Sequence, residues 1–207
     1  MEIEMKFAIP NKEVAEAIWQ DEYLNSVGDA SSREEIYMKS AYFDTEDKVL
    51  LKDNVAFRVR MEGNKVVASL KWKGGSAEGL HKREEINVPV DDPACFLQPS
   101  PEIFKESELG VDMMDLVGTE HLHSILEMNF IRKRIRADFK ESIMELAIDM
   151  GEILTKDGEI PICELEIELF SGSEEDVKEL GEIIKEKYNL EPLDASKYAR
   201  GLNLLHE

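Results

Sequence analysis

Residues 164–168 read Glu164-Leu165-Glu166-Ile167-Glu168, with a carboxylate at every second position and an apolar side chain between. Side chains of a β-strand alternate between its two faces, so this stretch predicts a strand with one acidic and one apolar face. A charged strand face usually points to water. The neighbouring segments decide whether that ordinary interpretation is sufficient for this chain.

The same alternation occurs elsewhere, and the sign of the charge is sorted between segments. The shared faces are Glu2, Glu4 and Lys6; Arg58 and Arg60; Lys71 and Lys73; Arg83 and Glu85; Arg132, Arg134 and Arg136; and Glu145 and Asp149. Two like charges about 4 Å apart repel by about 4 kcal/mol at an effective dielectric of 20. Basic faces of this kind are favoured where carboxylates or a bound polyanion neutralise them, as inside a barrel that binds polyphosphate.

The pattern of strands and turns predicts an α+β fold, an eight-stranded antiparallel β-barrel with peripheral helices. The expected strands are 1–9, 36–43, 55–61, 66–72, 80–90, 123–139, 142–150 and 160–170, and the expected helices are 12–25, 173–188 and 195–205. Eight antiparallel strands can close on themselves and so avoid exposed edges. We expect a single domain over residues 1–207. The stretch 91–118 contains three prolines and short helical patterns, so it predicts a helical insertion.

Composition limits the partners of the chain. Its 207 residues are 43% hydrophobic and carry a formal net charge of −20, which predicts a folded protein that repels nucleic acid and anionic membranes. No apolar run approaches the ~18–20 residues of a membrane span. Cys95 and Cys163 form no disulfide framework, so a cytoplasmic location is expected. The insertion is expected to cap one end of the barrel or to form a contact in a homodimer.

An ordered set of motifs resembles one known family over essentially the whole chain. The motifs are Glu2-x-Glu4-x-Lys6, Tyr42-Phe43-Asp44-Thr45, Arg58-x-Arg60, Leu70-Lys71, Arg83-x-Glu85, the Arg132–Arg136 run, the Glu164–Glu168 run, and Ser196-Lys197-Tyr198-Ala199-Arg200-Gly201. In this order they resemble the CYTH superfamily, the triphosphate tunnel metalloenzymes. The segments 79–83, 147–151 and 161–166 are most similar to its bacterial inorganic triphosphatase branch, some of whose members continue into a helical domain that this chain is expected to lack.

The resemblance implies roles for individual residues. The implied metal ligands, for Mg²⁺ or Mn²⁺, are Glu2, Glu4, Glu164, Glu166 and Glu168. The implied substrate-binding residues are Lys6, Arg58, Arg60, Lys71, Lys73, Arg83, Arg132, Arg134, Arg136, Lys197 and Arg200. The implied catalytic residues are Lys6, Lys71, Glu85 and Glu145. One departure is Ala147, at a position where many relatives carry an acid.

The implied activity is metal-dependent hydrolysis of inorganic triphosphate, a small-molecule substrate, to diphosphate and phosphate. The alternatives on the same fold are an adenylate cyclase and a thiamine triphosphatase, and a further alternative is a non-catalytic polyphosphate-binding module. Organic substrates need a surface that contacts a ring. Trp72 lies between Lys71 and Lys73 and is expected to face away from the barrel interior. With no other aromatic residue assigned to the interior, the sequence favours inorganic triphosphate.

Overall fold

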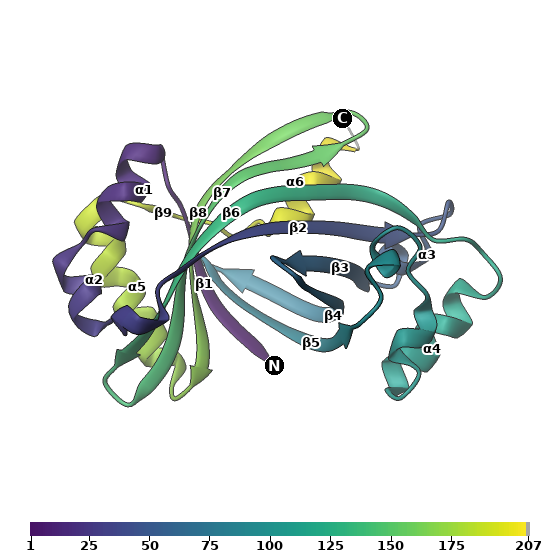
Figure 1. Ribbon diagram of the computed structural model, residues 1–207, viewed down its shortest axis with the longest axis horizontal. Coiled ribbons are helices and arrows are strands. Elements are labelled where there is room, and N and C mark those ends of the chain that lie inside the picture. Colours follow the sequence, from purple (N-terminus) through teal and green to yellow (C-terminus); the bar gives the residue numbers. More distant parts are fainter. Residues whose placement is uncertain (206–207) are drawn as a thin grey trace.

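The alternating segments form the wall of a closed barrel (Figure 1). The structure, a computed structural model, describes residues 1–205. Eight strands lie around the wall in the order β5-β4-β3-β2-β6-β7-β8-β1, each antiparallel to its neighbours, and β5 pairs with β1. They are β1 (Glu2–Ala8), β2 (Glu34–Asp44), β3 (Ala56–Glu62), β4 (Lys65–Ala77), β5 (Leu80–Val90), β6 (His123–Phe139), β7 (Ser142–Thr155) and β8 (Gly158–Ser171). The predicted α+β fold with an eight-stranded antiparallel barrel is confirmed.

Strand β1 closes the barrel. Residues 2–5 pair with β5, and residues 4–8 pair with β8, so Glu4 lies between two partner strands. A short strand, β9 (Glu191–Pro192), pairs with the end of β1. Closure removes the long unpaired edges that an open sheet of this size would present.

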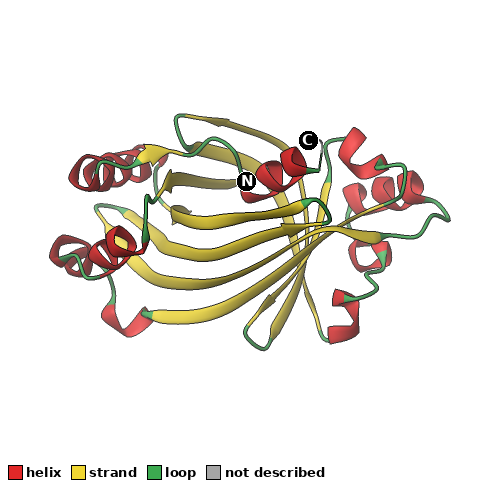
Figure 2. Cartoon of the chain, turned by 90° about the horizontal axis from the view of Figure 1, so that it is seen from above, coloured by secondary structure: helices red, strands yellow, loops and turns green. Residues whose placement is uncertain are grey.

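The apolar outer faces of the strands are covered by two groups of helices at opposite ends of the molecule (Figure 2). Three helices, α1 (Lys12–Trp19), α2 (Glu22–Val27) and α5 (Glu174–Tyr188), cover a core that includes Phe7 and Leu165. At the other end, α3 (Val49–Lys52) and α4 (Glu108–Val117) cover a core that includes Phe57 and Phe104. The apolar residues that alternate with charged residues along these strands therefore face outward, toward the helices.

The predicted helix over residues 12–25 is two helices. The side chain of Asp21 accepts hydrogen bonds from the backbone N–H groups of Tyr23, at 2.9 Å, and Leu24, at 3.0 Å, and so begins α2. An aspartate in this position satisfies donors that a continuous helix would bond internally. The chain therefore turns at Gln20–Asp21 and packs both helices against the same face of the barrel.

The insertion predicted at residues 91–118 consists of two short 3₁₀ helices, Pro93–Phe96 and Pro101–Phe104, followed by α4. A third 3₁₀ helix, Ala30–Ser32, precedes β2. Within residues 1–205, no helix has both the length and the apolar character needed to cross a membrane.

The terminal helix α6 (Lys197–Leu204) packs against the inner side of the wall rather than its outer side (Figure 1). Tyr198 and Leu202 pack against a cluster that includes Leu126 and Ile153. At Gly201 an added Cβ would lie 2.9 Å from a methyl group of Leu126, so glycine allows the helix to approach the strands closely. One part of the barrel interior is therefore an apolar core filled by α6.

Candidate functional site

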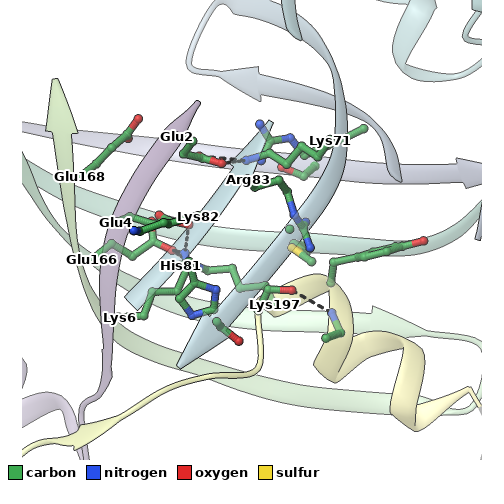
Figure 3. A pocket seen from close by; sticks show the side chains of 18 of the residues that line it. Glu2, Glu4, Lys6, Lys71, His81, Lys82, Arg83, Glu166, Glu168 and Lys197 are labelled. Atoms are coloured by element: carbon green, nitrogen blue, oxygen red, sulfur yellow. Dashed lines mark hydrogen bonds and ion pairs between the residues drawn. The ribbon is translucent and has the colours of Figure 1, made fainter. Parts of the chain in front are cut away.

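The rest of the interior is a charged cavity of about 240 Å³, between β1, β8 and the strands β3–β5 (Figure 3). Its charged lining residues are Glu2, Glu4, Lys6, Arg58, Arg60, Lys71, Lys82, Arg83, Arg132, Glu166, Glu168, Asp194 and Lys197. The structure thus brings together most of the basic and acidic residues singled out from the sequence. They come from strands far apart in the chain and from the first residue of α6.

Two lysines meet at one carboxylate deep in the cavity. The Nζ atoms of Lys6 and Lys197 both contact Glu166, and Lys6 also lies 2.9 Å from Glu4. Burial alone would lower the pKa of Lys6, but the carboxylates of Glu166 and Glu4 outweigh it and raise the pKa well above its usual value. The pKa of Glu166 is held well below its usual value, because Lys197, Lys6 and Arg132 outweigh the effect of burial. Both lysines therefore stay charged.

Arg132 occupies a neighbouring position on β6. Its guanidinium forms two hydrogen bonds with Asp149, of 2.8 and 2.7 Å, and also contacts Glu166. Asp149 lies opposite Glu164 in the pairing of β7 with β8 and is fully buried. Asp149 thus supplies a carboxylate two residues beyond Ala147, on the same face of β7.

Lys71 and Arg58 form a second basic group. The Nζ of Lys71 lies 2.8 Å from Glu2 and 3.2 Å from Glu85, while Arg58 lies 3.2 Å from Glu85. Burial would raise the pKa of Glu85, but Lys71 and Arg58 outweigh it and lower the pKa. Glu85 therefore stays ionised and holds the two cations side by side.

Several basic groups retain free hydrogen-bonding capacity. Among residues 1–205 Arg83 makes no ion pair, although it lines the cavity. The Nε atoms of Arg58 and Arg60 are buried without a hydrogen-bond partner in the described chain. Burial, followed by the nearby charge of Arg58, lowers the pKa of Arg60. An anion in the cavity would relieve both effects, because it would accept hydrogen bonds and offset the clustered positive charge.

Two groups of carboxylates are candidates for holding a metal ion. Asp149, Glu164 and Glu166 have oxygens within 4.8 Å of one another. However, Lys197 contacts all three of them, and Arg132 and Arg200 contact them as well. This group already carries its counter-charge and fits a metal ion poorly.

The second group is centred on Glu168. No cation pairs with Glu168 in residues 1–205, and burial together with the charges of Glu2, Glu4, Glu166 and Glu145 raises its pKa to about 7. A carboxylate held among other carboxylates without a counter-ion fits a divalent cation that takes oxygen ligands. Glu168 is therefore the predicted ligand most free to bind a metal ion, while Glu4 and Glu2 would have to exchange their contacts with Lys6 and Lys71.

The structure leaves some of the predicted substrate-binding residues away from the cavity. Lys73 is exposed, because β4 has a bulge between Trp72 and Gly75 that shifts the alternation of side chains. Arg136 pairs with Asp138 at the surface, since the pairing of β2 with β6 extends only as far as Arg134. Arg134 itself contacts Glu34 and lies 3.5 Å from Glu145.

Other predicted residues lie directly behind the cavity. Glu164 is fully buried beneath Lys197, and Arg200 contacts it from α6 without lining the cavity. Glu145 lies 3.9 Å from Arg132, and burial raises its pKa. These residues contact cavity residues and are in position to orient them.

The expectation that no aromatic residue faces the interior is wrong. Tyr42, Phe130 and Tyr198 line the cavity, and the rings of Tyr42 and Tyr198 stack with their centroids 4.6 Å apart. The inward position of Tyr42 could have been predicted from alternation along β2, because its neighbour Phe43 faces the outer core. Tyr198 could not be assigned in this way, because a helix brings it into the barrel.

His81, which is not singled out from the sequence, also lines the cavity. Its Nε2 lies 2.7 Å from the carbonyl oxygen of Leu193, and burial lowers the pKa of the imidazole. The imidazole ring therefore contacts the backbone at Leu193 and also faces the charged cavity (Figure 3).

The fold and this cavity define a class: closed antiparallel barrels whose interior carries basic side chains beside buried carboxylates. The chain belongs to the CYTH domain family, whose profile matches residues 1–202. The resemblance inferred from the motifs is confirmed.

The chain is similar to a named protein in sequence and to solved structures in fold. An inorganic triphosphatase of Haemophilus influenzae is 30% identical over 171 residues, which are 80% of this chain and 45% of that protein, so the chain spans less than half of that relative's length. A Hippeastrum protein, described as an adenylyl cyclase candidate with a dominant triphosphatase activity, superposes with a TM-score of 0.68 at 22% identity, covering 98% of this chain and 96% of its own. A candidate adenylate cyclase of Bacillus halodurans gives 0.59 at 19% identity, covering 95% and 94%. These two structures support the fold.

Proposed function

We propose that the protein hydrolyses inorganic triphosphate to diphosphate and phosphate in the charged cavity, with Mg²⁺ or Mn²⁺. The observation that carries the proposal is the convergence of eight basic side chains on the cavity that Glu2, Glu4 and Glu168 also line. The eight are Lys6, Arg58, Arg60, Lys71, Lys82, Arg83, Arg132 and Lys197. The name of the Haemophilus influenzae relative supports this substrate.

The basic residues would hold the phosphate groups. Arginine forks and lysine ammonium groups make charge-assisted hydrogen bonds with phosphate oxygens, which are about twice as strong as neutral ones. Arg60 and Arg83 are the residues with most free capacity, while Lys6, Lys71 and Lys197 would exchange some of their carboxylate contacts for phosphate. Catalysis in such a site is mostly positioning and electrostatic stabilisation.

The metal ligands would be Glu168, Glu4 and Glu2. Glu166 and Glu164, the other two ligands predicted from the sequence, are held by lysine and arginine side chains and are the weaker candidates. A divalent cation bound there would supply positive charge to the phosphate oxygens. The charge of Glu168, which lacks a cation partner in the described chain, is the observation that supports this assignment over the more compact group around Asp149.

The chain's own groups would orient the attacking water. Lys6, Lys71, Glu85 and Glu145 are the predicted catalytic residues, and each contacts a group that lines the cavity. Water adds to the terminal phosphorus, the bond to the bridging oxygen breaks, and diphosphate leaves. Glu85, held ionised by Lys71 and Arg58, would act by orienting these two cations, since it does not itself line the cavity.

A second candidate function is hydrolysis or cyclisation of an organic triphosphate. Tyr42, Phe130 and Tyr198 line the cavity, so an adenylate cyclase or a thiamine triphosphatase would find aromatic surface there. A non-catalytic polyphosphate-binding module is the less favoured alternative, because it would not need the carboxylates near Glu168. We also propose a cytoplasmic protein without nucleic-acid or membrane partners, in line with its charge of −20, and a homodimer as its candidate assembly.

The test is a turnover panel of tripolyphosphate, ATP and thiamine triphosphate with each metal ion. We expect tripolyphosphate with Mg²⁺ or Mn²⁺ to release phosphate fastest. Glu4→Gln should lower the rate about a hundredfold or more, since it removes a charge that acts on the reacting groups. Glu159→Gln, at an exposed glutamate at the start of β8, should leave the rate unchanged. Equal activity in EDTA would rule out the metal, and cyclic AMP from ATP would favour the cyclase.

A further inference from the structure

The segment that leads into α6, residues 192–196, is tied to two other parts of the barrel. The N–H of Leu193 donates to the carbonyl of Lys6 on β1, at 2.9 Å, and the carbonyl of Leu193 lies 2.7 Å from the ring of His81 on β5. We call this segment the strap. It enters α6 at Ser196, whose side chain accepts from the N–H of Ala199 and begins the helix.

Asp194 ties the strap to the hairpin between β4 and β5. Its Oδ1 accepts a hydrogen bond from the N–H of Gly79, at 2.7 Å, and its carbonyl accepts one from the hydroxyl of Ser76, at 2.8 Å. The Gly79 carbonyl in turn accepts from the N–H of Lys6, at 2.8 Å. One side chain therefore joins the hairpin, the strap and, through Gly79, strand β1.

The turn at Gly79 brings backbone unusually close to Lys6. Gly79 has φ +81°, and an added Cβ would lie 2.6 Å from the carbonyl oxygen of Lys6. Only glycine can take this conformation at this distance, so the turn presents its N–H in a fixed direction. Asp194 accepts from that N–H and satisfies a donor at the tip of the hairpin.

Three residues after Asp194, Lys197 reaches the same carboxylate as Lys6. Lys197 Nζ lies 2.9 Å from Glu166 Oε1, the atom that Lys6 also contacts. The two lysines come from opposite ends of the chain, and no neighbour in sequence holds them together. The strap is the direct covalent connection between the hairpin contact and Lys197, so its position decides where this ammonium group lies.

We propose that Asp194 is a positioning residue for Lys197: by bonding the hairpin to the strap, it sets Lys197 beside Lys6 in the cavity. This inference rests on the proposed function. The role depends on the hydrogen bond rather than on the charge, since an acidic charge at the edge of a phosphate-binding cavity would itself repel the substrate. Asp194 is exposed, so water competes for the bond and the effect of losing it is moderate.

The experiment compares Asp194→Ala with Asp194→Asn in tripolyphosphate hydrolysis and in calorimetric binding of tripolyphosphate. We expect Asp194→Ala to lower kcat/KM about three- to tenfold, in line with the loss of one net hydrogen bond. Asp194→Asn keeps the acceptor oxygen and should restore the wild-type value. Asp157→Ala, at an exposed aspartate in the turn between β7 and β8, is the matched control and should change nothing.

A double-mutant cycle with Lys197→Gln tests whether Asp194 acts through Lys197. We expect Asp194→Ala to have little further effect once Lys197 is replaced. Equal effects in both backgrounds, or wild-type activity of Asp194→Ala, would overturn the inference. Should Asp194→Ala unfold, Ser76→Ala removes the other hydrogen bond of the same connection and should lower kcat/KM in its place. A wild-type protein that neither binds nor hydrolyses tripolyphosphate would instead contradict the proposed function, and the inference with it.

Discussion

Two regions of the barrel interior are built from the same strands and differ completely in chemistry. Along β6, Leu126 belongs to the apolar cluster under α6, and Arg132 lies in the charged cavity six residues later. Along β8, Ile162 is apolar and Glu166 is charged. All four side chains are spaced to share the inner face. Alternation thus decides which face a side chain takes, and position along the strand decides which region it enters.

The difference teaches how a protein of formal charge −20 keeps a basic interior. In the charged region nearly every cation has a carboxylate neighbour, as Arg132 has Asp149 and Lys71 has Glu2. In the apolar region α6 fills the space, so neither water nor ligand is needed to complete the packing. The charged region contains the cavity. Packing of α6 in the apolar region fixes the first residue of that helix, Lys197, at the edge of the cavity.

The largest expected effect comes from breaking the charge balance of the first region. Arg132→Met would leave Asp149 and Glu166 short of a partner in a buried position, which costs about 3–5 kcal/mol of stability. Urea unfolding at pH 7 measures this loss. Arg136→Met, on the same strand but exposed, should show no measurable change. Equal stability of the two variants would mean that the buried cations do not balance the carboxylates.

A smaller effect is expected from a charge outside both regions. Burial alone would raise the pKa of Asp21, but Lys187, the Tyr188 hydroxyl and the Leu24 N–H outweigh it and lower the pKa to about 2. Because this pKa lies below the unfolded value, Asp21 stabilises the fold above about pH 4, and the contribution of about 2 kcal/mol is lost as the pH falls from 4 toward 2.

Urea unfolding of wild type and Asp21→Asn between pH 6 and pH 3 checks this dependence. The variant retains a side-chain oxygen for the helix cap and should be less stable at pH 6. The gap should narrow as the pH falls. A difference in stability between the two proteins that does not change with pH would show that the helix cap, rather than the charge of Asp21, is responsible. Charges outside the barrel would then contribute less than those inside it.

The smallest effect is expected from a substitution in the apolar region under α6. Ile153 is fully buried under α6, so Ile153→Val removes one methylene group and costs about 0.5–1.5 kcal/mol. Thermal unfolding measures the loss, while the KM for tripolyphosphate should not change. A KM that rises with the loss of stability would show that the two regions are coupled through α6.

Much of the fold follows from alternation because the signal is local. Glu164–Glu168 and Arg132–Arg136 each show their two faces within five residues, and hairpin turns such as Gly63-Asn64 fix which strands pair. The break at Asp21 is harder to predict, because the side chain bonds the backbone of a second helix only after the chain has turned.

The site is less predictable, because small irregularities redirect single side chains. A bulge turns Lys73 outward, and the end of the β2–β6 pairing leaves Arg136 outside the wall. Tyr198 and His81 enter the site through contacts between distant parts of the chain. Those contacts depend on how α6 and the strap are placed, and no pattern within one segment contains that information.

The closing position of β1 has a consequence for the order in which the protein can form. Glu2 and Glu4 are synthesised first, yet β1 pairs with β5 and with β8, which ends at Ser171. Until β8 has emerged from the ribosome, β1 lacks one of its two partner strands, and Glu2 and Glu4 have no acidic neighbours from β8. The group around Glu168 therefore assembles only after β8 has been synthesised, which delays the repulsion among these carboxylates until the rest of the barrel can form around them.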